Sequence, residues 1–165
     1  MALDAIQETA LATTFALLRR WGACPEGYRT LAQHLGGVQA YGPSTPIPLS
    51  VIVAANGLAD ALWCLRAVPP EQAATRDRLA RLFACDCAEH VLPYFEASYP
   101  EDQRPRACIQ VARRFALGQA TDEELAAAYA AAAAARSAGA DGADGAAERE
   151  WQTRRLLHRL EASWS

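Results

Sequence analysis

The sequence contains no lysine, and all 16 of its basic residues are arginine. Because 19 acidic residues oppose them, the net charge over 165 residues is only −3, too weak a field to favour nucleic acid as a partner. The sequence also lacks an apolar run of roughly 18–20 residues, the length that a membrane span needs. The composition therefore argues against a nucleic-acid-binding protein and against a membrane protein.

The sequence shows neither a signal-peptide pattern nor a disulfide framework. Asp4 and Glu8 stand where a signal peptide carries positive charge, so we expect a cytoplasmic protein. Its cysteines are odd in number and fall within apolar helical patterns, where a reduced thiol packs as a small hydrophobe. These are Cys24, Cys64, Cys85, Cys87 and Cys108.

Apolar residues recur at helical spacing through most of the chain, and no alternating pattern indicates a strand. The first such helix begins at Leu3 and ends at Trp21, before Gly22 and Pro25. We expect an all-α fold: one domain over residues 1–165, a bundle of six to eight helices. Two irregular segments interrupt it, a Pro/Gly-rich loop at about 36–48 and a flexible turn at about 138–146.

Two of the expected helices have distinctive sequences. The longest runs from about Pro70 to Ser98 and should be kinked at Pro93, because proline cannot donate a hydrogen bond to the carbonyl of Glu89. The other is an Ala-rich helix over residues 122–137. Thr121, followed by Glu124 three residues later, is the pattern of a capping box and should begin it.

The stretch "FACDCAEHVLPYFEASYPEDQRPR" (83–106) resembles a metal site, but helical geometry speaks against one. Cys85 and Cys87 would lie about 160° apart around a helix, so they cannot share a zinc ion. Asp86, His90 and Tyr94 fall on the stripe expected to face the core, with Glu89 and Glu96 on the other side. A buried carboxylate needs a partner, and we expect either an arginine from the following helix or the amides of a helix end to supply it.

Arginines gather in the helix that follows Pro105. Arg106, Gln110 and Arg113 form a ladder along it, and Arg104 should anchor the preceding turn onto the long helix. The ladder could hold carboxylates or phosphates of a partner, or it could pair with nearby acidic residues of the chain itself.

The last helix, over about residues 146–163, places Trp151, Arg155 and His158 opposite its leucine stripe. Tryptophan and arginine are enriched in binding hot spots, so these residues are candidates for an interaction surface, unless a neighbouring helix covers them.

Motifs of the common enzyme classes are missing from the sequence. It contains no G-x-G-x-x-G, Walker A, H-E-x-x-H, G-x-S-x-G or EF-hand pattern, and no nucleophile stands at a persuasive spacing from a histidine. We therefore expect no catalytic residue, no metal, no cofactor and no enzymatic activity.

Three segments, "NGLADALWCLRAV", "ACDCAEHVLPYFEASYPEDQRPRACIQVARRFALG" and "EREWQTRRLL", together resemble the α-helical immunity proteins of bacterial polymorphic toxin systems. The resemblance covers roughly residues 56–160 and is most specific over Tyr99–Arg113. It implies a small helical protein that binds and neutralises a cognate toxin by occlusion. The positions that match are Asp86, Cys87, Glu89, Pro93, Glu96, Pro100, Arg104, Pro105, Arg106, Arg113, Trp151 and Gln152.

Two other functions remain open at this point. The chain could be a small-ligand-binding or catalytic bundle in which Asp86, His90, Tyr94 and Arg104 or Arg106 line a pocket. It could also be a structural module of a larger assembly. The residues that we expect in a pocket or interface are Asp86, His90, Tyr94, Arg104, Arg106, Gln110, Arg113, Trp151 and Arg155.

Overall fold

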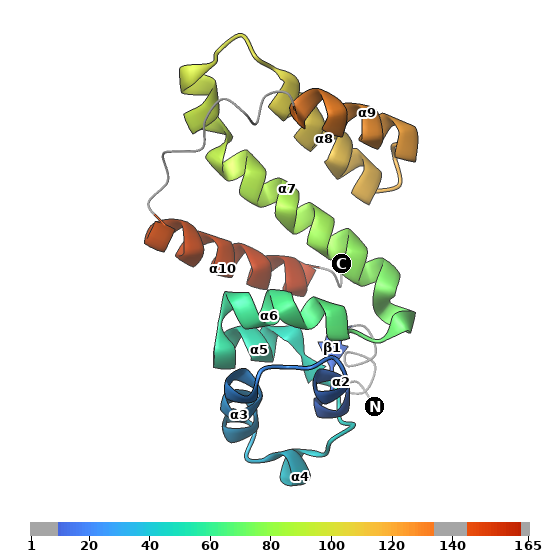
Figure 1. Ribbon diagram of the computed structural model, residues 1–165, viewed down its shortest axis with the longest axis vertical. Helices are drawn as coiled ribbons and strands as arrows, with labels where there is room; N and C mark the ends of the chain where they lie inside the picture. Colours follow the sequence, from blue (N-terminus) through green and yellow to red (C-terminus); the bar gives the residue numbers. More distant parts are fainter. Residues whose placement is uncertain (1–9, 134–144, 163–165) are drawn as a thin grey trace. The chain divides into compact units, whose positions relative to one another are not determined.

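The computed structural model describes residues 10–133 and 145–162, and these residues are almost entirely helical (Figure 1). They form nine α-helices, two short 3₁₀ turns and one pair of two-residue strands. The predicted all-α class is confirmed. In these residues the helices exceed the expected six to eight by one, because the predicted loop at 36–48 contains α4 (Val38–Tyr41) and strand β2 (Ile47–Pro48).

The described residues group into two compact units. The first unit comprises residues of 1–76 and 152–165, and the second unit comprises residues of 77–151. Both boundaries fall inside helices, one in α7 (Ala73–Ser98) and the other in α10 (Gly145–Ala162). The single domain expected from the sequence stays a prediction.

A small antiparallel strand pair opens the first unit. β1 (Ala12–Thr13) pairs with β2 so that Ala12 lies opposite Pro48 and Thr13 opposite Ile47. The prediction of a helix through this region is wrong for Ala12 and Thr13, and its residues 3–9 lie outside the described residues. Helix α2 (Phe15–Arg20) begins only after Thr14, whose Oγ1 accepts a hydrogen bond from Leu17 N at 3.1 Å and thus caps the helix.

Phe15 is the centre of the core of the first unit. Its side chain is fully buried, and its ring packs edge-on against Tyr28 and Tyr41, with ring centroids 5.2 and 6.2 Å away. Thr13 is equally buried, and its Oγ1 donates a hydrogen bond to the Ala67 carbonyl at 2.7 Å. This bond joins β1 to the 3₁₀ turn Leu65–Ala67, 54 residues further along the chain.

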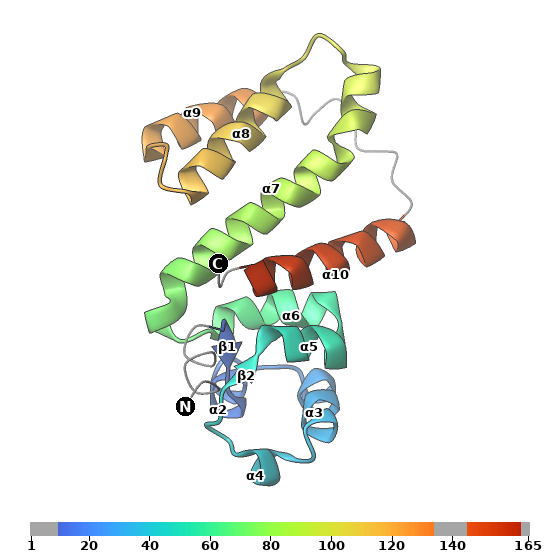
Figure 2. The same cartoon turned by 180° about the vertical axis from the view of Figure 1, so that it is seen from behind.

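Helices α3 (Pro25–His34), α5 (Leu49–Asn56) and α6 (Leu58–Cys64) complete the layers of the first unit, with α5 in contact with both of the others (Figures 1 and 2). Helix α2 ends before Gly22 and Pro25, as expected, and Pro25 begins α3, where its missing N–H costs nothing. Gly27 permits a close approach, because a Cβ at this position would lie 2.6 Å from Asp60 Oδ2.

The second unit is built from α7, α8 (Arg104–Ala116) and α9 (Asp122–Ala133), with α8 and α9 packed side by side (Figures 1 and 2). Helix α7 changes direction toward its C-terminal end, in the part that contains Pro93, as predicted. The predicted capping box of α9 is confirmed: Glu124 N donates to Thr121 Oγ1 at 3.2 Å, and Thr121 N donates to a Glu124 carboxylate oxygen at 2.8 Å.

A small cluster of apolar side chains forms the core of the second unit. Cys85 of α7, Ala112 of α8 and Leu125 of α9 form its buried cluster, with Ile109, Val111 and Phe115 packed against it. The predicted flexible turn at 138–146 lies outside the described residues up to 144, and residues 145 and 146 already belong to α10.

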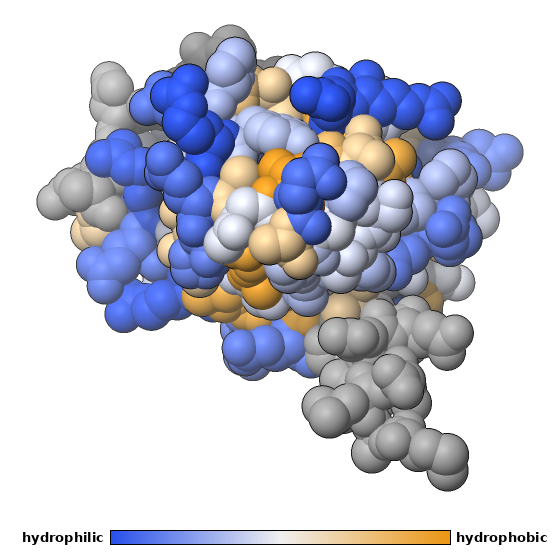
Figure 3. Space-filling view, turned by 90° about the horizontal axis from the view of Figure 1, so that it is seen from below, coloured by the Kyte–Doolittle hydropathy of each residue, from blue (hydrophilic) through white to orange (hydrophobic). Residues whose placement is uncertain are grey.

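Polar residues cover most of the face of the molecule shown in Figure 3, and hydrophobic residues reach it only in small areas between them. This distribution is the one expected of helices that bury one side and expose the other. In the part of the chain that the structure describes, no helix combines the length and apolar character that crossing a bilayer requires.

We predict that Thr13→Val destabilises the fold. Valine keeps the shape of threonine but leaves the buried Ala67 carbonyl without its donor, which should cost about 1–3 kcal/mol of unfolding free energy. Denaturant unfolding measures the effect. Thr30→Val, at an exposed position of α3, is the matched control and should leave the midpoint almost unchanged. Equal stability of the two variants would contradict the prediction.

Candidate functional site

Helices α7 and α8 run antiparallel and are joined by ion pairs at matching intervals. Arg106 donates two hydrogen bonds to Glu96, at 2.7 and 2.6 Å, and Arg113 donates one to Glu89 at 2.7 Å. The two glutamates are seven residues apart on α7, and the two arginines are seven residues apart on α8, a spacing close to two helical turns. The two rows of charge therefore meet in register along the contact between the helices.

The pair between Asp86 and Arg113 is the most deeply buried of these contacts. Arg113 Nη1 donates to Asp86 Oδ1 at 2.8 Å, and the side chain of Asp86 is only 2% exposed. The expectation that Asp86 finds an arginine of the following helix is confirmed. Burial by itself would lower the pKa of Arg113, but its hydrogen bond to Asp86 and the charges of Asp86 and Glu89 raise it, so the guanidinium stays charged.

The expected core-facing stripe of α7 is right for Asp86 and wrong for His90 and Tyr94. His90 and Tyr94 are exposed, Tyr94 by 57%, whereas Glu89 and Glu96, expected to point away, reach the arginines of α8. The buried residues of α7 include Cys85 as well as Phe83, so the packed arc is centred nearer Asp86. The helical period was right, but the sequence did not show which flank α8 would cover.

The turn between α7 and α8 closes on itself. Arg104 donates to Asp102 from Nε at 2.8 Å, from Nη2 at 2.6 Å and from its backbone N–H at 3.1 Å. Arg104 was expected to anchor this turn onto α7, but that prediction is wrong, because Arg106 makes the contact to α7 through Glu96.

The start of α10 contacts α7 through His90. The Nδ1 of His90 lies 2.7 Å from a carboxylate oxygen of Glu148, and its ring stacks on the indole of Trp151 with centroids 3.8 Å apart and planes at 8°. His90 is therefore not a core residue, and it contacts two side chains one turn apart on α10. This stacking covers one ring face of Trp151, so helix α7 covers part of a residue that was a candidate for an interaction surface.

The remaining predicted residues do not converge on one point. Gln110 is exposed on α8, and Arg155 is partly exposed in the first unit. The sequence analysis missed Leu117 and Tyr129, which are 43% and 42% exposed. Tyr129 accepts a hydrogen bond from Arg81 at 3.3 Å.

The ion pairs and hydrogen bonds described above join polar side chains of neighbouring helices in the second unit. Arg81 also lies 4.8 Å from the centroid of the Phe115 ring. Burial raises the pKa of the Cys85 thiol, which makes it a poor nucleophile. Among the described residues, no group of three or more His, Cys, Asp or Glu side chains is arranged to hold a metal ion.

The second unit thus consists of helices joined by ion pairs, with aromatic residues exposed on its surface, and such a surface is suited to binding. Residues 72–149, which include almost all of it, match the family described as "Imm-5 like putative immunity protein". This match confirms the resemblance drawn from the sequence and assigns the segment to a family of immunity proteins. No curated protein and no solved structure matches the chain significantly.

We predict that Arg113→Ala destabilises the protein by about 3 kcal/mol, because it leaves the buried carboxylate of Asp86 without its counter-ion. Arg104→Ala is the matched control. Its guanidinium is exposed and pairs within a surface turn, so its loss should stay within the error of a denaturant unfolding measurement. A result in which both variants unfold at the wild-type midpoint would show that the Asp86 pair contributes nothing.

A second prediction concerns the acid limb of stability. The hydrogen bonds from Arg106 lower the pKa of Glu96, and those from Arg104 lower the pKa of Asp102. For Glu96, the lowered pKa contributes its full stabilisation of the folded state at pH values above the ordinary glutamate pKa of about 4.3. This contribution is lost as the pH falls through the lowered pKa.

Carboxyl-carbon NMR titration tests this assignment residue by residue. Arg106→Gln should raise the pKa of Glu96 and leave that of Asp102 unchanged, and Arg104→Gln should do the reverse. Each variant therefore controls for the other. An unchanged Glu96 titration in Arg106→Gln would contradict the pairing.

Proposed function

We propose that the chain is an immunity protein that binds a cognate bacterial toxin and neutralises it by occlusion, without catalysis. The observation that carries this proposal is the family match over residues 72–149. The geometry supports it, because these residues form helices braced by ion pairs, and a rigid surface loses little conformational entropy when it binds.

Exposed aromatic residues near the end of α7 are the strongest candidates for contact with the toxin. Tyr94 and Tyr99 are 57% and 40% exposed, and the ring of Tyr99 packs against Phe95 at a centroid distance of 5.0 Å. Tyrosine is enriched in binding hot spots, and a ring already held by a neighbour needs little ordering on binding. We propose that this surface, defined by Tyr94 and Tyr99, contacts the toxin, with Trp151 and Arg155 as further candidates.

A non-catalytic mechanism is supported by the way in which the reactive residue types are used. Asp86 is neutralised by Arg113, and His90 is held by Glu148 and Trp151. Tyr94 and Arg106 do not join them around a pocket: Tyr94 is exposed, and Arg106 is paired with Glu96. We further propose that the protein acts in the cytoplasm, where it would protect the cell that produces the toxin.

The direct test is co-expression with a cognate toxin domain, which we expect an adjacent gene to encode. We expect the two proteins to co-purify as a stoichiometric complex, and we expect toxin activity to fall to background when the immunity protein is equimolar. Toxin that remains fully active in the presence of excess folded protein would overturn the proposal.

Variants locate the interface. Tyr94→Ala should weaken toxin binding by about tenfold or more, since truncating a tyrosine hot spot removes its contact area, and should leave the unfolding midpoint unchanged. Leu117→Ala, at a similarly exposed position away from the end of α7, is the control. Weaker binding by the control alone, measured by calorimetric titration, would move the interface away from Tyr94.

A further inference from the structure

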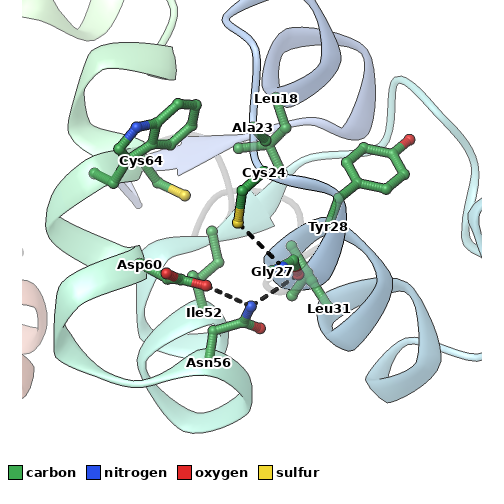
Figure 4. A pocket seen from close by; sticks show the side chains of 11 residues that line it. Leu18, Ala23, Cys24, Gly27, Tyr28, Leu31, Ile52, Asn56, Asp60 and Cys64 are labelled. Carbon is green, nitrogen blue, oxygen red and sulfur yellow. Dashed lines mark hydrogen bonds between the residues drawn. The ribbon is translucent and has the colours of Figure 1, made fainter.

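The first unit contains a pocket that the family match does not cover, since that match begins at residue 72. The pocket lies between α3, α5 and α6 and has a volume of about 100 Å³ (Figure 4). A single water molecule needs only about 10–15 Å³ of such space, so the pocket has room for a small organic group.

Apolar and aromatic side chains form most of its wall. Leu18, Leu31 and Ile52 supply aliphatic surface, and Tyr28 and Trp63 supply rings. The Trp63 ring already attracts one cation, because the guanidinium carbon of Arg66 lies 4.9 Å from its centroid. Such a wall favours a ligand with a short apolar stem.

Asp60 is the only charged residue among those that line the pocket. Its Oδ2 accepts a hydrogen bond from Asn56 Nδ2 at 2.8 Å, and within the described parts of the chain no arginine or histidine pairs with it. A carboxylate in a largely apolar pocket with no internal counter-ion attracts a cation from outside, because pairing offsets its partial desolvation.

Asn56 joins Asp60 to the start of α3. Its amide nitrogen donates to Asp60 Oδ2 and to the Gly27 carbonyl, both at 2.8 Å. Because both neighbours are acceptors, the amide cannot be turned over, and its Oδ1 is buried without a hydrogen-bond donor in the described structure. The polar groups of these residues therefore favour a ligand that brings donors.

The two thiols of the pocket do not compete for this role. Burial, together with the charge of Asp60, raises the pKa of Cys64 to about 12, so its thiol is neutral at physiological pH. Cys24 Sγ accepts a hydrogen bond from Gly27 N at 3.3 Å and caps α3. Figure 4 shows Cys24, Asp60 and Cys64 at the sides of the pocket.

We propose that this pocket binds an organic cation, an ammonium or guanidinium group on a short apolar stem, with Asp60 as its counter-ion. The stem lies against Leu18 and Ile52, and the donors of the cation reach the Asp60 carboxylate. This proposal does not rest on the proposed immunity function, because the pocket lies outside the segment that matches the family.

The probes are n-butylammonium and n-butylguanidinium, with n-butanol and butyrate as neutral and anionic counterparts. In ¹H–¹⁵N NMR titrations of the full chain, we expect the two cations to shift the Gly27 amide and the Trp63 indole, and the other two compounds to leave them unchanged. Binding of butanol as tight as that of the cations, or no shift with either cation, would overturn the proposal.

Asp60→Asn preserves the shape of the side chain and removes its charge, so it should weaken binding of the cations by about tenfold or more. Glu26→Gln is the matched control, because it removes a carboxylate of the same sign from the first turn of α3, outside the pocket lining. Equal losses in the two variants would mean that net charge alone drives binding, and would overturn the role of Asp60.

Gly27→Ala supplies a variant that is expected to stay folded. Alanine is the better helix former, but its Cβ would lie 2.6 Å from Asp60 Oδ2 and 3.2 Å from Cys24 Sγ, so the carboxylate must move. We expect an unchanged or higher unfolding midpoint together with loss of cation binding. Retained affinity in Gly27→Ala would show that the cation binds elsewhere.

The cation could be a free small molecule or the side chain of an arginine or lysine of a partner protein. A saturating amount of the toxin distinguishes these sources. Displacement of n-butylguanidinium by the toxin, together with weaker binding of the toxin to Asp60→Asn than to Glu26→Gln, assigns the pocket to a side chain of that partner. Undisturbed binding of the probe assigns it to a free organic cation.

Discussion

The second unit depends on one constraint, the need of a buried carboxylate for a counter-ion. Asp86 is the only charged residue that is buried among those the structure describes, and Arg113 neutralises it from the neighbouring helix. This pair fixes the register of the two antiparallel helices, and in that register Arg106 lies opposite Glu96. The exposed pair adds little stability by itself, but it repeats the same register two turns away.

In the second unit, charged side chains hold neighbouring helices together, and exposed aromatic rings form the surface that we propose contacts a partner. Arg104, Arg106 and Arg113 of α8 pair with carboxylates of α7 and of the adjoining turn. Arg114 pairs with Glu124 of α9, and His90 contacts the start of α10. The proposed contact with the toxin is made by exposed rings such as Tyr94 and Tyr99. The first unit differs, because none of the residues that line the pocket with Asp60 is a cation.

Much of the second unit could be predicted from local sequence signals. The capping box of α9, the proline within α7 and the pairing of Asp86 with an arginine of the next helix depend on spacing and on the cost of burying charge, and all three are found. The face of α7 could not be predicted, because its pattern allows more than one apolar arc. One signal was available: Glu89 and Glu96 have the same seven-residue spacing as Arg106 and Arg113, which an antiparallel pair would bring into register.

The sequence by itself determined the helical class, the helix ends set by caps and prolines, and the resemblance to immunity proteins, because each depends on residues close together in the chain or on a contiguous motif. Only the tertiary structure decided that Ala12 and Thr13 form a strand and that His90 contacts Trp151. It alone brought Gly27 against Asp60. These contacts join residues 33 to 61 positions apart, and they arise where the packing of whole helices overrides local preference.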